Sequence, residues 1–253
     1  MLTRFAPSPT GYLHLGHAHA ATQAFGFGPC LLRIEDIDKT RCRPEYKTAI
    51  YQDLDWLGFD WPIPVRIQSQ HRGAYMDVID NLKERGLLYR CFKTRAELQD
   101  NPPAPISDTE TQTRLENKDL FAWRLSIEKC HKRVKDRLGY IDTSQEKTVD
   151  MDRLEDIVVG RKDIGISYHI AVTHDDMIQN ITHVVRGADF IEQTPYHVLI
   201  QHLMGWPTPI YHHHDLLLRD DGEKLSKRHS DTTIRSLREN SLTAQQVLDM
   251  SAP

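Results

Sequence analysis

The sequence lacks the features of a membrane or secreted protein. No apolar run in its 253 residues approaches the ~18–20 residues that a membrane-spanning helix needs. The first residues enter a strand-like run directly, without the basic region and long apolar stretch of a signal peptide. Both absences indicate a cytoplasmic protein. Cysteine is scarce and forms no C-x-x-C pair, so separate reduced thiols are a better interpretation than disulfides. The four are Cys30, Cys42, Cys91 and Cys130.

An excess of positive charge is also missing. Lys and Arg number 32 and Asp and Glu number 36, a formal net charge of −4, whereas a nucleic-acid-binding protein usually carries a basic surface. One local basic cluster remains within residues 129–137. From charge alone, a solvated surface is a better interpretation of it than an RNA contact. The cluster consists of Lys129, His131, Lys132, Arg133, Lys135 and Arg137.

The composition that is present is ordinary for a globular protein, 39% hydrophobic and 27% charged. Short apolar runs alternate with helical patterns, which predicts βαβ units and a parallel sheet. Strands are expected at residues 2–5 and 30–34, and helices at 16–25, 44–57 and 75–85. The last helix is expected to turn Met76, Ile79 and Leu82 inward and to end at Gly86.

The pattern becomes more polar after residue 88, and three prolines make residues 101–105 a loop. The chain is therefore expected to consist of a first half-domain at 1–88, an inserted α/β subdomain at 89–163, a second half at 164–230 and a short helical tail at 231–253. Within the last two parts, sheet segments are expected at 164–172, 181–186 and 211–218, a helix at 194–203, and two short helices at 232–250.

The tetrapeptide His14-Leu15-Gly16-His17 lies between the first predicted strand and helix. In an open α/β sheet, ligands bind beyond the carboxyl ends of the strands, where helix N-termini favour anions. Two histidines three positions apart can both face a triphosphate there, and Gly16 lets a nucleotide approach the backbone. Taken alone, metal ligation or packing explains the histidines equally well.

A lysine-rich segment, Lys224-Leu225-Ser226-Lys227-Arg228, follows a turn signal and is expected on a mobile surface loop. Its lysines and serine can neutralise the charge that builds on a triphosphate during attack at the α-phosphorus. Taken alone, an ordinary charged loop is the better interpretation.

Together, these two motifs resemble the signature motifs of class I aminoacyl-tRNA synthetases in order, in spacing and in the βαβ pattern between them. Three more segments resemble the glutamyl branch of that family: residues 4–11 (RFAPSPTG), 32–38 (LRIEDID) and 184–189 (VVRGAD). The resemblance covers residues 1–86 and 160–230. It implies a Rossmann-like parallel sheet that forms the catalytic core, with the inserted subdomain between its halves.

By this resemblance, Arg4 and Arg186 bind the two carboxylates of glutamate, a role that suits the planar guanidinium group. Glu35 receives the substrate ammonium group and Tyr168 offers its hydroxyl. Ala6 and Ser8 complete the pocket. As alternatives, Arg4 and Glu35 are salt-bridged structural residues and Tyr168 is a half-buried sheet residue.

The resemblance also implies ATP with Mg²⁺. The α-carboxylate of glutamate attacks the α-phosphorus, pyrophosphate leaves, and the adenylate passes its glutamyl group to an acceptor. Catalytic roles fall to His14 and His17, which hold phosphate oxygens, and to Lys224 and Lys227, of which Lys227 follows the leaving pyrophosphate. Asp189 binds the ribose. The implied ATP contacts are His14, Gly16, His17, Asp189, Lys224, Ser226 and Lys227.

Full glutamyl synthetases carry a helical anticodon-binding region after the lysine loop, and this sequence ends soon after it. It therefore resembles a shortened branch of the family that transfers glutamate to queuosine in tRNA(Asp). Val172 stands where full enzymes tend to have asparagine, so weaker glutamate binding is expected. Two alternatives stay open: a catalytic fragment that charges tRNA(Glu), and a silent homologue that binds tRNA or a protein. A monomer is the default expectation.

Two motifs suggest a metal site, but neither is expected to bind a metal. Many members of the shortened branch hold zinc through C-x-C, a tyrosine and a later cysteine, but Cys91 is followed by Phe92 and Lys93. Because lysine cannot replace a thiolate ligand, no structural zinc is expected. In the run 212–214 (HHH), strand geometry sends His213 to the face opposite its neighbours. A structural or nucleotide-adjacent role is expected for this run.

Overall fold

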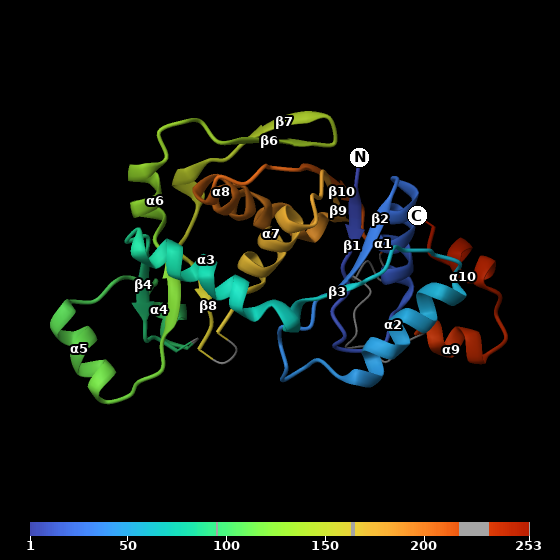
Figure 1. The fold of residues 1–253 in the computed structure, drawn as a ribbon, viewed down its shortest axis with the longest axis horizontal. Helices are drawn as coiled ribbons and strands as arrows, with labels where there is room; N and C mark the ends of the chain where they lie inside the picture. Colours follow the sequence, from blue (N-terminus) through green and yellow to red (C-terminus); the bar gives the residue numbers. More distant parts are fainter. Residues whose placement is uncertain (95, 163–164, 218–232, 253) are drawn as a thin grey trace.

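The computed structural model describes residues 1–94, 96–162, 165–217 and 233–252. Figure 1 shows an elongated molecule, with the early strands and the C-terminal helices at one end and the middle of the chain at the other. Long helices lie between the two ends. Within the described residues, no helix is long and apolar enough to cross a membrane.

The first part of the chain forms a small parallel sheet. Strand β1 (Thr3–Phe5) pairs with β2 (Cys30–Ile34), and β2 pairs with β3 (Arg66–Ile67). The connecting helices are α1 (Leu15–Gly26) and α2 (Pro44–Trp56). Helix α1 buries Ala18, Ala21 and Ala24, and such small side chains let a helix approach a sheet closely. Both strands and both helices predicted for this part are confirmed.

A second parallel sheet adjoins β1. Strand β9 (His183–Gly187) pairs with β10 (Ile210–His214), and helix α8 (Thr194–Met204) connects them after the 3-10 turn η3 (Ala188–Gln193). The backbone N–H groups of Thr182 and His183 both donate to the carbonyl of Leu2, which joins this sheet to β1. The predicted α/β fold with a parallel sheet is confirmed.

The middle of the chain adds an antiparallel sheet. Strand β5 (Ala122–Leu125) lies between β4 (Leu88–Cys91) and β8 (Ile157–Gly160). The hairpin of β6 (Gly139–Asp142) and β7 (Gln145–Thr148) instead extends the parallel sheet, because β6 pairs with β10. The accompanying helices are α4 (Glu97–Asp100), α5 (Asp108–Glu116), α6 (Ile127–Arg133) and the turn η2 (Met151–Arg153). The domain boundaries stay a prediction.

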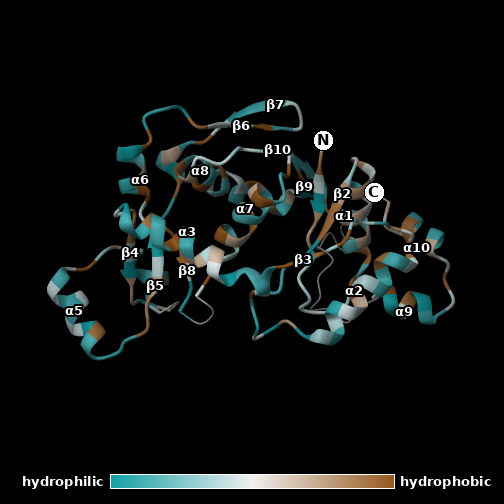
Figure 2. Cartoon of the chain, in the orientation of Figure 1, coloured by the Kyte–Doolittle hydropathy of each residue, from teal (hydrophilic) through white to brown (hydrophobic). Residues whose placement is uncertain are grey.

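The two short helices predicted for the tail are present. Helices α9 (Ile234–Glu239) and α10 (Ala244–Met250) pack against α2 and α1, and Ile234, Leu237 and Val247 are buried there. Figure 2 shows hydrophobic residues along β2, and mostly hydrophilic ones on the hairpin β6–β7. The buried side chains of the tail thus join the hydrophobic core that the first sheet forms with α1 and α2.

Three expectations need correction. The sheet segment expected at 164–172 is wrong, because the chain forms helix α7 (Tyr168–Ile178) from Tyr168 on. The side chain of Ser167 caps this helix by accepting a hydrogen bond from the backbone N–H of Ile170. A short apolar run is compatible with either a buried strand or a buried helix, and packing against α3 and α8 selects the helix. The last strand ends at His214, earlier than expected.

Helix α3 (Arg72–Glu84) follows the turn η1 (Gln68–His71) and ends before Gly86, whose φ of 72° suits glycine. Its predicted inner face is wrong at Met76, which is 38% exposed. The buried side chains are Tyr75, Val78, Ile79 and Leu82. Ile79 and Leu82 are therefore buried as predicted, while Tyr75 and Val78 take the place of Met76 on the inner face.

Candidate active site

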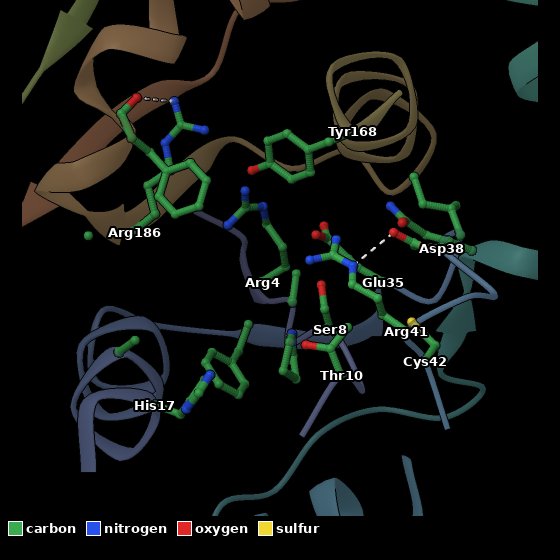
Figure 3. Close-up of a pocket in the computed structure, with 18 of the residues that line it drawn as sticks. Arg4, Ser8, Thr10, His17, Glu35, Asp38, Arg41, Cys42, Tyr168 and Arg186 are labelled. Atoms are coloured by element: carbon green, nitrogen blue, oxygen red, sulfur yellow. Dashed lines mark hydrogen bonds and ion pairs between the residues drawn. The ribbon is translucent and has the colours of Figure 1, made fainter. Parts of the chain in front are cut away.

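A cavity of about 490 Å³ lies where the two parallel sheets meet. Its walls come from β1 and the following loop, the end of β2, the start of α7 and the end of β9. Figure 3 shows Arg4, Ser8, Glu35 and Tyr168 directed into this cavity. Arg4, Ser8 and Glu35 lie on the parallel strand β1 or in the segments that follow β1 and β2, which is where open α/β sheets bind ligands.

His14 and His17 form the N-terminal cap of α1. The N–H of Gly16 donates to Nδ1 of His14 (3.1 Å), and the N–H of His14 donates to Nδ1 of His17 (3.2 Å). In a neutral ring whose Nδ1 accepts a hydrogen bond, the proton lies on Nε2. Each Nε2 is then a hydrogen-bond donor beside a helix N-terminus, which suits phosphate oxygens. His17 lines the cavity.

Arg4 is held by a buried carboxylate on α7. Its Nε donates to Oδ1 of Asp176 (2.9 Å), and Nη1 of Arg33 donates to the same oxygen (2.8 Å). All three side chains are almost inaccessible to solvent. Burial raises the pKa of Asp176, but Arg4 and Arg33 outweigh it, so the pKa lies below its usual value. Asp176 is therefore an ionised anchor for Arg4.

The neighbouring Asp175 extends this network to β3, η1 and α3. It accepts hydrogen bonds from Nε of Arg66 (2.7 Å), Nε2 of Gln68 (3.0 Å) and the hydroxyl of Tyr75 (2.9 Å). The side chain is fully buried. Burial opposes ionisation, but a hydrogen bond from His174, the charges of Arg33 and Arg66 and the hydrogen bond from Tyr75 hold the pKa of Asp175 below its usual value. Asp175 thus fixes the helix that carries Asp176.

Glu35 lies at the end of β2, beside Nη2 of Arg33 (3.3 Å). Burial raises the pKa of its carboxyl group, while Arg33 and Arg4 lower it in part. An ammonium group arriving next to Glu35 would favour the carboxylate form further. Glu35 therefore contacts a structural arginine, and its role as receiver of the substrate ammonium group stays a prediction.

Arg186, at the end of β9, has neutral partners. Its Nη1 donates to Nδ1 of His197 (3.1 Å), Nη2 to Oγ1 of Thr194 (2.7 Å), and Nε to Nε2 of His213 (3.3 Å). His197 in turn contacts Nδ1 of His169 through Nε2 (3.1 Å). Burial and the charge of Arg186 hold the pKa of His197 well below its usual value and lower that of His169 to about 4. The histidines are therefore uncharged acceptors.

Tyr168 is the first residue of α7, so the expectation of a sheet residue is wrong. Its ring lies 5.9 Å from that of Phe190 and 5.6 Å from that of His197. Burial raises its pKa to about 12, which keeps the phenol protonated. Figure 3 shows the hydroxyl directed toward the Arg4 guanidinium. Ala6 and Ser8 line the same cavity from the loop after β1.

Of the predicted ATP contacts that remain, Asp189 is the one within the described residues. Asp189 lies in η3, beside the end of β9, and a Cβ at Gly187 would come within 2.6 Å of its Oδ1. Any larger residue at Gly187 would displace the side chain of Asp189. Lys224, Ser226 and Lys227 fall outside the described residues.

Sequence reasoning missed the residues that hold the two arginines. Asp175 and Asp176 were not singled out, although two adjacent carboxylates in an otherwise apolar helix signal buried partners. Asp142, which contacts Nδ1 of His213 (2.9 Å), was also missed. Its signal is weaker, because an aspartate before a hairpin turn is common.

The described residues contain no group of three or more His, Cys, Asp or Glu side chains that could hold a metal. Cys91 and Cys130 are buried thiols, and burial raises the pKa of Cys130 to about 12. At the position where the zinc pattern has a second cysteine, Nζ of Lys93 donates to the carbonyl of Pro102 (2.9 Å). The absence of structural zinc stays a prediction.

Comparison with known families places these features in context. The model of the class I tRNA synthetases (E and Q), catalytic domain, matches residues 1–250. A glutamyl-Q tRNA(Asp) synthetase from Rhodobacter capsulatus is 38% identical, over 90% of this chain and 91% of its own length. A glutamate–tRNA ligase from Aquifex aeolicus is 35% identical, over 94% of this chain and 53% of its own length.

Solved structures agree with the sequence matches. A glutamate–tRNA synthetase from Elizabethkingia anophelis has a TM-score of 0.75 and 28% identity, covering 90% of this chain and 52% of its own. One from Elizabethkingia meningosepticum, in complex with its amino acid, has a TM-score of 0.72 and 28% identity, covering 91% of this chain and 52% of its own. This chain thus spans about half the length of both synthetases.

Proposed function

The chain belongs to the class I tRNA synthetase family of the glutamate and glutamine enzymes, and we propose that it activates glutamate with ATP, without needing tRNA, and transfers the glutamyl group to queuosine in the anticodon loop of tRNA(Asp). Enzymes of this class are ligases that use ATP, typically with Mg²⁺.

The convergence of Arg4, Arg186 and Glu35 on one cavity is the observation that carries the proposal. Glutamate has two carboxylates and one ammonium group at neutral pH, so two cations and one anion match its charges. Guanidinium groups bind carboxylates through paired hydrogen bonds. In the proposed complex, the arginines take the carboxylates, Glu35 takes the ammonium group, and Tyr168 and Ser8 contribute hydroxyl groups.

Activation joins an oxygen of the α-carboxylate to the α-phosphorus and breaks the bond to pyrophosphate. His14 and His17 are proposed to donate from Nε2 to phosphate oxygens, and their Nδ1 atoms are already fixed by the backbone. Gly16 and Asp189 are assigned to the nucleotide, and Lys224, Ser226 and Lys227 to the departing pyrophosphate. Fixed donors stabilise charge that develops during such a transfer.

The queuosine assignment is supported by the similarity to a glutamyl-Q tRNA(Asp) synthetase along nearly the whole of both chains. Val172 lies on α7, one turn after Tyr168, and is buried. It offers no hydrogen bond to a substrate, which agrees with the expected weak binding of glutamate. A monomer and a cytoplasmic location are proposed as defaults.

The RNA contact is proposed at helix α6 and the chain leading to the hairpin. All six basic residues of the cluster are exposed. Part of their charge is compensated, since Lys132 contacts Glu128 and His131 contacts Asp152. Replacing Lys129, Lys132 and Lys135 by glutamate should weaken transfer to RNA and reduce its salt dependence.

This RNA assignment has a simple internal control. Glutamate-dependent ATP–pyrophosphate exchange should be unchanged in the triple variant, and Lys118→Glu, a charge reversal next to α5, should affect neither step. Equal loss of exchange and transfer in the triple variant would remove the assignment.

The whole proposal is tested by exchange with and without tRNA, followed by transfer of labelled glutamate to tRNA(Asp) that contains or lacks queuosine. We expect exchange without tRNA and label only on the queuosine-containing RNA. Exchange that requires tRNA(Glu), with label on its terminal adenosine, would favour the activity named for the longer glutamate–tRNA ligases. No exchange under any condition would leave a non-catalytic binding protein.

A further inference from the structure

The three consecutive histidines on β10 face two sides of the sheet, as predicted. The ring of His212 packs on that of Phe27 (centroids 4.2 Å apart) and the ring of His214 on that of His19 (4.9 Å). Both therefore lie on the face of the sheet that α1 covers. His213 faces the opposite side, where its ring nitrogens contact Asp142, Arg186 and Thr194. The side chain is 3% exposed. This buried position is not explained by packing alone.

The hydrogen-bond partners of His213 define which of its ring nitrogens carries the proton. Oδ2 of Asp142 accepts from Nδ1 (2.9 Å), which leaves Nε2 as an acceptor. Nε of Arg186 then donates to Nε2 (3.3 Å). Oγ1 of Thr194 also contacts this nitrogen (3.1 Å) and accepts from Nη2 of Arg186 (2.7 Å). A carboxylate, an imidazole and a guanidinium are thus connected in series.

The carboxylate of this series comes from the inserted part of the chain. Asp142 is the last residue of β6, where β6 pairs with Tyr211 of β10. The next residue reinforces the contact, because the N–H of Thr143 donates to the carbonyl of Tyr211 (2.9 Å). Asp142 is 12% exposed. The hairpin β6–β7 therefore reaches the side of the sheet on which Arg186 lies.

We propose that His213 is a positioning residue for Arg186, and that Asp142 on the hairpin β6–β7 fixes the tautomer that this task requires. The inference rests on the proposed binding of glutamate by Arg186. A neutral His213 orients the guanidinium without neutralising it, so its full charge stays available for a substrate carboxylate. The hairpin of the inserted part thereby becomes a component of the glutamate site.

Two substitutions distinguish the contact made by Nδ1 of His213 from the contact made by Nε2. In His213→Asn the amide nitrogen occupies the position of Nδ1, so the contact with Asp142 is kept and that with Arg186 is lost. In His213→Gln the amide oxygen reaches the position of Nε2, so the contact with Arg186 is kept. Glutamate-dependent ATP–pyrophosphate exchange should show a KM for glutamate about tenfold higher in His213→Asn and nearly normal in His213→Gln.

Three further measurements complete this test. The KM for ATP and kcat at saturating glutamate should stay normal in both variants, since His213 acts only through Arg186. His212→Asn, the same change on the other face, should leave all constants unchanged. Asp142→Ala should raise the KM for glutamate in the same direction as His213→Asn.

The outcomes that overturn the inference are distinct from failure of the proposed function. If wild-type protein shows no glutamate-dependent exchange, both the inference and the proposed function are wrong. If wild type exchanges but His213→Asn and His213→Gln change the KM equally, or change only kcat or the ATP constant, His213 has no positioning role. A normal KM in Asp142→Ala removes the hairpin from the site.

Discussion

The two arginines of the cavity are held in opposite electrostatic ways. Arg4 lies against the ionised Asp176, which it shares with Arg33, inside a network of buried charges. Arg186 lies among neutral groups, namely two imidazoles and a hydroxyl. Among the described residues, Arg4 therefore contacts a carboxylate directly, whereas the ring of His213 separates Arg186 from the carboxylate of Asp142.

This difference indicates a division of work between the halves. A buried ion pair is costly to assemble, and it is strongly destabilising to break because the remaining charge stays buried without a partner. Neutral acceptors impose geometry on a cation while leaving its charge for another anion. We infer that the Arg4 side contributes mainly to the folded framework, whereas the Arg186 side supplies most of the attraction for a carboxylate.

The largest expected effect comes from breaking the charged half. Asp176→Asn removes the anion between Arg4 and Arg33 and leaves two buried cations close together. We expect the free energy of unfolding to fall by about 3–5 kcal/mol, the cost of breaking a buried pair. Urea unfolding at pH 7 measures this directly.

Gln179→Ala is the matched control for that variant. Oε1 of Gln179 accepts from the same Nη1 of Arg33 (3.0 Å), but it is a neutral partner. Its loss should cost only about 1 kcal/mol, the net value of one ordinary hydrogen bond. Similar losses in the two variants would show that charge is not what stabilises this half.

The second effect addresses the neutral half. Arg186→Met removes a cation whose partners carry no charge, so unfolding should change much less than in Asp176→Asn. Glutamate-dependent exchange should fall by about a hundredfold in kcat/KM, since a charge-assisted contact contributes about 1.5–3 kcal/mol. Unfolding and exchange are measured on the same preparation. A variant that loses as much stability as Asp176→Asn would contradict the division of work.

The sequence was sufficient to predict the elements with strong local signals. Pro44 begins α2, Gly86 with its positive φ follows α3, and the alanines of α1 mark a helix that packs closely on a sheet. It was not sufficient for α7, because the apolar run that contains Tyr168 and Val172 has no period that separates a helix from a strand.

The framework of the site could not be predicted, for a similar reason. Arg4 and Asp176 are separated by 172 positions, and Asp142 and His213 by 71. Nothing local marks which buried carboxylate meets which cation, since only the assembled sheets bring them together. The predicted pocket residues were found through resemblance, which identifies side chains that meet a ligand more readily than those that support them.

The smallest expected effect is the contribution of one histidine near Arg186 to the pH dependence of stability over the first pH unit below 6.5. His169 and His197 have lowered pKa values in the folded protein, so below pH 6.5 the unfolded chain binds protons that the fold excludes. Stability therefore falls from pH 6.5 toward pH 4, by up to about 1.4 kcal/mol per pH unit for each such histidine. Asp175 and Asp176 also have lowered pKa values, but as acids they lose their contribution only below about pH 3.8.

Thermal unfolding at pH 7.5, 5.5 and 3.5 distinguishes these windows, with His169→Asn as the decisive variant. The amide oxygen of asparagine can take the position of Nδ1 and still accept a hydrogen bond from Nε2 of His197, but asparagine does not titrate. The variant should therefore lose less stability than wild type between pH 7.5 and 5.5, while the further loss at pH 3.5 stays similar. Because other buried groups such as Asp53, with a pKa raised to about 6, titrate in the same range, only the difference between variant and wild type is informative. Identical profiles would mean that the histidines around Arg186 are not kept neutral by the fold, and the contrast between the two arginines would lose its electrostatic basis.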